Sequence, residues 1–316
     1  MEPATFWRAM PNAGVLLCWL VAWTALFHYW GNSTLGYVKS PSLFRWWLWT
    51  IAGIDDQKVL AYVMPAIVLG LIWWRWEEIA ALPKRIWWPA LALFLLATLL
   101  HVLGYRIQQA RVSVAAFFAG IYALTGLVWG WAWLRATFFP FALLVFCVPL
   151  GGGAEPLTVP LRLLATKITA ILCHVLGVNV IHQGNLLFDA AGDYQYEVAA
   201  ACSGIKSLTE ITAFGVICGY VCLKSAWRRI LVVGAAIPMA VAANVCRLTM
   251  IVLASETFGR NAGDYVHKSY WLSLVPYIPA FGGLGLVAYW LRENRKRRAP
   301  AAEPAPLLAA KAESKL

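Results

Sequence analysis

The chain has 316 residues, of which 61% are hydrophobic and only 13% are charged, and its mean hydropathy is +0.66. Soluble domains carry about 25% charged and about 45–50% apolar residues, so this composition excludes an ordinary soluble protein, a disordered chain and a collagen-like chain. The formal net charge of +11 comes mostly from basic residues spread among the connections between apolar runs, which argues against nucleic acid as a partner. The composition therefore indicates a polytopic membrane protein.

Apolar runs of membrane-crossing length recur along the chain and predict about eight transmembrane helices. We expect these spans at 11–30, 58–76, 86–104, 112–132, 135–150, 203–223, 229–253 and 271–291. The expected fold class is all-α, with a small extracytoplasmic amphipathic helix and a β-hairpin region between the fifth and sixth spans. Residues 1–298 are expected to form one integral membrane domain, and residues 299–316, rich in Ala, Pro, Glu and Lys, a disordered cytoplasmic tail.

Basic residues are modestly more frequent on one side of this arrangement, and such connections remain in the cytoplasm. The cytoplasmic side would carry Arg75, Lys84, Arg85, Arg135, Lys224, Arg228, Arg229 and the cluster Arg292–Arg298. The cluster directly follows an apolar run, where it would face anionic membrane lipid. We therefore expect both termini in the cytoplasm.

The longest connection, 151–201, then lies on the outer side. Apolar residues recur at helical spacing between Pro160 and Leu176, which predicts an amphipathic helix on the membrane surface. The segment Asn179–Phe188 is predicted to form a hairpin around a Gly-Asn turn, and Tyr194–Val198 is predicted to form a further strand. A small sheet is therefore expected to lead directly into Cys202.

Three residues with catalytic potential fall on this outer side. Cys202 is at the entrance to the sixth span, where helix-start amides favour a thiolate. Arg247 lies in the seventh span, about 9 Å below an outer end at Leu253 at 1.5 Å per residue. His267 is expected in the outer loop before the eighth span. A Cys and a His can form a nucleophile–base pair, and an Arg can stabilise an oxyanion.

Each of these residues also has a structural interpretation. A cysteine at a helix start most often only packs, and a histidine in a loop is most often only solvated. A guanidinium inside a span is costly and therefore functional or paired. The alternative for Arg247 is an ion pair with Glu210, about two turns below Cys202 and at similar depth, and this pair would not exclude catalysis.

The ordered combination of motifs resembles the exosortase/archaeosortase family. Members of that family carry a Cys-Ser-Gly core, an Asn-x-x-Arg motif in a later span and a downstream His. The matching residues are Cys202, Ser203, Gly204, Asn244, Arg247 and His267. The resemblance covers roughly residues 130–270, and it extends to the first hundred residues only through their hydropathy.

The resemblance implies a membrane-embedded cysteine protease or transpeptidase of the bacterial inner membrane, with its active site facing the periplasm. Its partners would be exported proteins ending in a sorting motif, a transmembrane helix and a basic tail, together with an unknown acceptor and membrane lipid. An exopolysaccharide or surface-protein setting is implied as well. Cys202 would be the nucleophile, His267 the acid/base and Arg247 the transition-state stabiliser. The residues expected to contact substrate are Ser203, Gly204, Asn244 and Glu210.

No cofactor or metal is expected, because the five histidines form no HExxH motif and no carboxylates cluster near them. A different class of function remains open: a polytopic transporter, or a polysaccharide polymerase or assembly protein, without a catalytic Cys. A transporter would use Arg247 and Glu210 on a translocation path, and it would predict repeated halves or a pair of broken helices. The sequence contains neither feature.

Overall fold

The computed structural model describes residues 10–34, 38–53, 58–149, 155–189, 195–197 and 205–292. Four of the sequence predictions fall outside these residues: the placement of Cys202, of Ser203 and of Gly204, and the tail 299–316.

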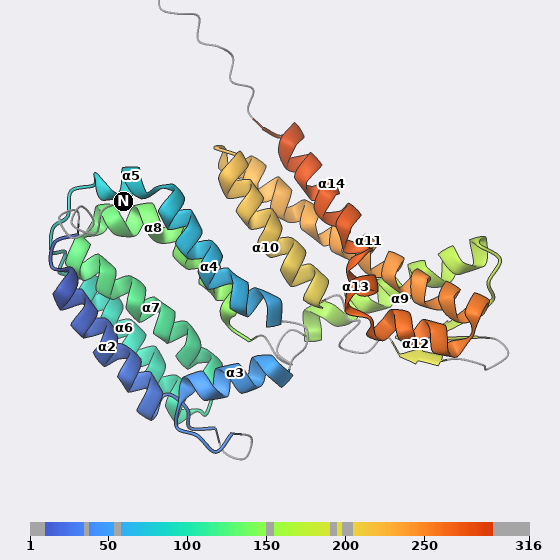
Figure 1. The fold of residues 1–316 in the computed structure, drawn as a ribbon, viewed down its shortest axis with the longest axis horizontal. Helices are drawn as coiled ribbons and strands as arrows, with labels where there is room; N and C mark the ends of the chain where they lie inside the picture. The colour runs from blue at the N-terminus through green and yellow to red at the C-terminus, as the bar shows by residue number, and fades with distance from the viewer. Residues whose placement is uncertain are drawn as a thin grey trace, which may run out of the picture.

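The N-terminal part of the chain is a group of helices joined by short connections (Figure 1). They are α2 (Ala13–Trp30), α3 (Leu43–Gly53), α4 (Lys58–Trp74), α5 (Trp76–Ala80), α6 (Pro89–Arg106), α7 (Ala110–Trp129), α8 (Trp131–Ala142) and the 3-10 helix η1 (Leu143–Cys147). Helices α2, α6 and α7 lie side by side, and α4 packs along η1. Aromatic and branched side chains on these helices form two buried clusters.

The C-terminal part contains a second helical group and the small sheet. Its elements are α9 (Glu155–Val175), β1 (Val180–Gln183), β2 (Leu186–Asp189), β3 (Gln195–Glu197), α10 (Ile205–Cys222), α11 (Ala226–Phe258), α12 (Arg260–Lys268), α13 (Tyr270–Leu274) and α14 (Tyr277–Trp290). Helices α10, α11 and α14 pack together, while α9, the sheet and α12 gather around the far end of α11 (Figure 1).

The expectation of a mostly helical membrane protein is confirmed. Four helices, α2, α6, α7 and α11, are long and apolar enough to cross a membrane, and shorter apolar helices cover Leu60–Trp74, Trp131–Cys147 and Leu208–Cys222. Each predicted span overlaps at least one helix. The eighth span is divided, because α13 ends at Leu274 and α14 begins only after Pro276. A proline has no backbone N–H, so it suits the start of a helix better than its interior.

The predicted hairpin is present. Strands β1 and β2 pair antiparallel, with Gln183 opposite Leu186 and a tight turn at Gly184, whose φ of +61° is accessible to glycine at little steric cost. Strand β3 adds to β2, which gives the order β1-β2-β3. Val180 and Leu187 are buried against α9 and α11, so the sheet is fixed to the helices that surround it.

The predicted amphipathic helix is α9, and its two faces have different surroundings. The large apolar side chains Leu164, Ile168 and Val175 are exposed, as expected for a helix that contacts lipid. The buried face consists of small or polar residues: Ala165, Thr166, Thr169, Ala170 and Cys173. Small side chains allow α9 to pack closely against α11.

Three features depart from the sequence predictions. Helix α3 was not predicted, His267 lies in helix α12 and not in a loop, and α11 extends beyond both predicted ends of 229–253. With 33 residues, α11 is about 50 Å long, which exceeds the hydrocarbon thickness of about 30 Å. The helix continues to Phe258, but a helix longer than the bilayer does not mark the membrane boundary with its end, so the depth of Arg247 below Leu253 stays a prediction.

Close packing of α2 against α7 depends on Gly120. A Cβ at this position would overlap the indole ring of Trp23. That ring cannot move easily, because its Nε1 donates a hydrogen bond to the Phe117 carbonyl at 3.0 Å and the rings of Phe27 and Phe94 lie 4.9 and 4.8 Å away. We expect Gly120→Ala to destabilise the protein by about 1–3 kcal/mol, as overpacking does.

Thermal unfolding of the detergent-solubilised chain measures this effect, and Gly70→Ala is the matched control. Gly70 is a helical glycine of α4, and no other described atom comes within 4 Å of an added Cβ there. The control should match the wild type or gain slightly in stability. Equal midpoints for the two variants would contradict the close-packing argument.

Candidate functional site

Helix α11 is the element around which the candidate site is built. One face of α11, including Ala240 and Ala243, packs against α10 and α14. The opposite face, including Val245 and Leu248, packs against α9 and the sheet. Arg247 follows Ala243 by four residues and therefore continues the row that faces α10 and α14. Its side chain is half-buried.

Asn244 lies one turn before Arg247, between these two faces, and is only 2% exposed. Its Oδ1 accepts no hydrogen bond from any described residue. Burying an amide oxygen without a donor costs about 1–3 kcal/mol. Such a cost at a packed position points to a role for this oxygen other than stability.

The chain returns toward Arg247 through α12. Gly259, with φ +81°, reverses the chain direction after α11, and α12 then packs back along α11 (Figure 1). At 1.5 Å per residue, His267 lies about 12 Å from this turn along α12, and Arg247 lies about 18 Å from it along α11. Their positions along the direction of α11 therefore differ by about 6 Å. His267 is half-buried. The structure therefore brings the elements that carry these two predicted residues together.

The sixth predicted span is α10, and its first described residue, Ile205, follows Cys202 by three positions. Glu210 is half-buried in the second turn of α10, which packs against α11. Both Glu210 and Arg247 have interaction partners. The ion pair between them remains the alternative role for Arg247.

Thr169 is a buried polar residue that the sequence analysis did not single out. It lies on the face of α9 that packs against α11, and its Oγ1 has no hydrogen-bond partner among the described residues. The signal was present in the sequence as a threonine within an amphipathic helix. Nearby Cys173 is not a competing nucleophile, because burial raises the pKa of its thiol to about 11 and keeps it protonated at neutral pH.

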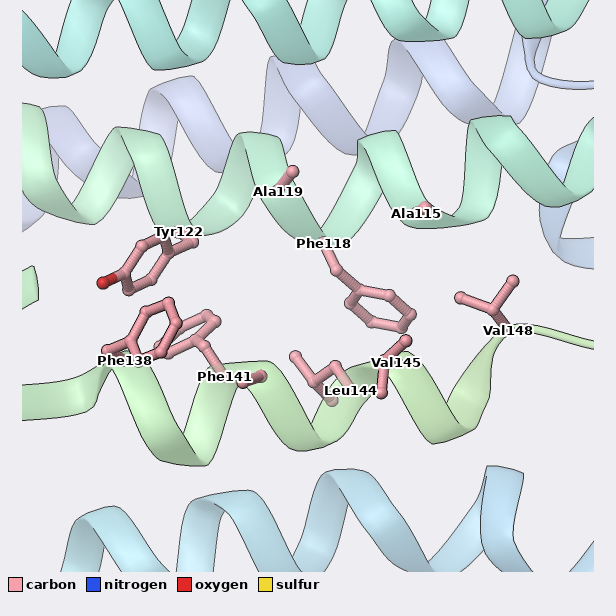
Figure 2. Close-up of a pocket in the computed structure, with 10 residues that line it drawn as sticks. Ala115, Phe118, Ala119, Tyr122, Phe138, Phe141, Leu144, Val145 and Val148 are labelled. Atoms are coloured by element: carbon pink, nitrogen blue, oxygen red, sulfur yellow. The ribbon is translucent and has the colours of Figure 1, made fainter. Parts of the chain in front are cut away.

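An apolar pocket of about 230 Å³ lies elsewhere, between α7 and the segment formed by α8 and η1 (Figure 2). Phe118, Phe141 and Val145 are among its lining residues, and Tyr122 is the only one of the ten with a polar side-chain group. The Tyr122 hydroxyl donates a hydrogen bond to the Leu134 carbonyl at 2.6 Å. None of the predicted site residues lines this pocket, so it offers no nucleophile or acid/base.

No curated protein and no solved structure matches the chain. The family model described as transmembrane exosortase (Exosortase_EpsH) matches residues 46–278, which is more than two thirds of the chain. The match includes Asn244 and Arg247 on α11, His267 on α12 and the Cys202 position. The chain therefore belongs to the transmembrane exosortase family and is a multi-pass membrane protein.

Proposed function

We propose that this exosortase is a cysteine transpeptidase or protease that cleaves the C-terminal sorting signal of exported proteins. One observation carries the proposal: within the region that matches the family, Asn244 and Arg247 occupy successive turns of α11 beside α10, and α12 carries His267 back along the same helix. Cys202 is three positions before the described start of α10. These four positions supply a thiol, a guanidinium, an imidazole and an amide.

In the proposed reaction, the Cys202 thiolate attacks the carbonyl carbon of the scissile peptide bond. The carbonyl oxygen becomes an oxyanion, to which Arg247 donates hydrogen bonds. His267 holds the proton taken from the thiol and transfers it to the leaving amine as the carbon–nitrogen bond breaks. The resulting thioester is attacked by a lipid, a glycan or water, which releases the thiol.

Substrate contacts complete the proposed site. The buried Oδ1 of Asn244 would accept a hydrogen bond from a backbone N–H of the substrate, which would satisfy its acceptor. Ser203, Gly204 and Glu210 would contact the segment around the scissile bond.

We also propose about eight spans, with both termini in the cytoplasm and the site at the periplasmic face of the bacterial inner membrane. Arg75, Lys224, Arg229 and Arg292, four residues assigned to the cytoplasmic side from sequence, line one pocket in the structure. This pocket lies at the end of α10 opposite the Cys202 end, and 18 residues of helix separate the two ends by about 27 Å. That distance is close to the thickness of a bilayer core and supports placing the pocket and Cys202 at opposite faces of the membrane.

The function is tested by co-expression with a tagged exported protein that ends in a motif, a helix and a basic tail. We expect a gel-mobility shift that depends on this chain, with the product found outside the inner membrane. The same substrate without its sorting motif is the control and should stay uncleaved. Cleavage of both substrates, or cleavage without this chain, would contradict the proposal.

Strand β3 offers a second point of contact for the substrate. It is at an edge of the sheet and ends at Glu197, five residues before Cys202. An extended sorting motif could add to this edge as a fourth strand, through main-chain hydrogen bonds. We therefore propose that the sheet holds the motif while the thiol reacts.

N-methylation of single amides in a motif peptide of a processed substrate tests this strand addition. Only every second amide of an added strand donates to the sheet. Methylation of one of those amides should make the peptide about 5-fold weaker as a competitor of the substrate, since each lost hydrogen bond to the sheet contributes about 1 kcal/mol. Methylation of the intervening amides is the control. A uniform effect, or none, would exclude the strand-addition mode.

A further inference from the structure

Basic side chains from separate parts of the chain line one pocket of about 610 Å³. Its lining residues come from the region where α4, α10 and α14 end and α11 begins. Figure 1 shows these helix ends. The lining of the pocket includes Trp74, Arg75, Tyr220, Lys224, Arg229 and Arg292. This volume is within the range of about 300–1,000 Å³ typical of ligand sites.

The charge in this pocket favours an anion. Four basic residues line it, and Glu78 is the only acidic residue among the lining residues that the structure describes. Glu78 is already engaged, because it accepts hydrogen bonds from Arg75 Nε and Nη2 at 2.9 and 2.7 Å. Lys224 and Arg292 are exposed and form no ion pair with any described residue. The net charge of the lining is therefore positive, with two side chains available for a ligand.

The wall of the pocket is held in place by contacts that need no ligand. Arg75 Nη1 donates a hydrogen bond to the Tyr220 hydroxyl at 2.6 Å, and the Tyr220 ring stacks on Phe139 with centroids 3.7 Å apart. Arg229 donates from Nε and Nη2 to the Leu223 carbonyl at 3.0 and 2.8 Å. Its guanidinium also lies 5.5 Å from the Tyr220 ring centroid. Such pre-organisation reduces the entropy that a bound ligand must offset.

We propose that this pocket binds the phosphate group of an anionic phospholipid headgroup. A lipid is favoured over a soluble phosphate because the pocket lies at the ends of apolar helices, where a bilayer meets water. Trp74 and Val221 line the pocket, Ile230 follows the lining residue Arg229 on α11, and the three side chains are 62%, 43% and 70% exposed. Acyl chains can lie along these apolar side chains while the phosphate contacts Lys224 and Arg292. The site is independent of Cys202 and goes beyond the proposed catalytic function.

The test titrates the full-length chain in neutral detergent with short-chain phosphatidylglycerol, phosphatidylcholine of equal chain length, and inorganic phosphate, with binding followed by thermophoresis. Phosphatidylglycerol should bind saturably and at least about 10-fold more tightly than the other two probes. Lys224→Gln and Arg292→Gln should each weaken it about 5-fold, because a basic residue near an anionic surface contributes about 1 kcal/mol. The double variant Lys224→Gln/Arg292→Gln should weaken phosphatidylglycerol binding roughly 25-fold.

Arg135→Gln is the matched control, since Arg135 is an exposed arginine of the same predicted membrane side that does not line the pocket. It should bind phosphatidylglycerol as the wild type does. If inorganic phosphate bound as tightly as phosphatidylglycerol, the ligand would be a soluble anion and not a lipid, and the assignment would be overturned. Wild-type affinity in the double variant, or equal losses in Arg135→Gln, would overturn the site itself.

Discussion

The Cys202→Ala variant is expected to reduce processing of a co-expressed substrate by roughly 1,000-fold or more, at unchanged abundance in the membrane. Without the thiol, no atom in the proposed site can form the thioester. The guanidinium of Arg247 and the imidazole of His267 would remain, but they could only assist direct attack by water. Gel mobility of the tagged substrate measures processing, and an immunoblot of the membrane fraction measures the amount of enzyme.

Cys246→Ala is the matched control for this variant. Cys246 is an exposed thiol on α11, one residue before Arg247 and within the same family match. Its replacement should leave processing unchanged. If Cys202→Ala processes substrate as the wild type does, the nucleophile assignment is wrong. A transporter or a polysaccharide polymerase, which would use Arg247 and Glu210 without a catalytic Cys, would then be favoured.

The helices that cross the apolar region could be predicted because their signal is local. A helix such as α6 or α7 needs about 20 apolar residues in succession, and the bilayer requires its backbone groups to be bonded internally. The predicted spans 86–104 and 112–132 therefore differ from α6 and α7 by only two or three residues at each end. The hairpin was equally accessible, since Gly184 in a tight turn is a local feature.

The short helices could not be predicted in the same way, because their stability depends on packing against other helices and not on their own apolar length. The nine residues of α12 include charged residues from one end to the other, and the sequence therefore predicts a loop there. It is helical in the structure, where it packs against α11. Helix α3 is similar: Trp47 donates a hydrogen bond from Nε1 to the Cys147 carbonyl, a hundred residues away, at 2.8 Å. No pattern within either segment encodes these contacts.

The candidate site and the basic pocket illustrate the same difference. Asn244 and Arg247 are the first and last residues of one four-residue motif on one helix, so their relation follows from sequence spacing. Arg75 and Arg292 are separated by most of the chain, and the sequence predicts only that they lie on the same side of the membrane, with Arg292 in a cluster that faces lipid. The fold brings them into one pocket. The charge bias therefore predicts the membrane side of these residues, and only the three-dimensional arrangement shows that they line the same pocket.

Arg247→Gln is expected to slow processing by about 100- to 1,000-fold, which is the usual effect of removing one oxyanion donor. Arg247→Lys should also be slow, because an ammonium keeps the charge but lacks the planar pair of donors. The half-buried position of Arg247, on the row of α11 that faces α10, lets its guanidinium act at low dielectric. Pulse-chase rates, normalised to enzyme abundance, measure the effect.

Glu210 distinguishes a catalytic Arg247 from a purely structural one. If the two side chains only form an ion pair, Glu210→Gln and Arg247→Gln would each leave a charge without its partner, at a cost of about 3–5 kcal/mol when the pair is buried. Both variants would then lose membrane abundance, and Glu210→Gln/Arg247→Gln would recover abundance and processing together. For a catalytic Arg247, the double variant should instead accumulate normally and stay as slow as Arg247→Gln. Recovery of processing in the double variant would show that the reaction does not need the Arg247 guanidinium, because the glutamine amide is shorter, uncharged and lacks its planar pair of charged donors.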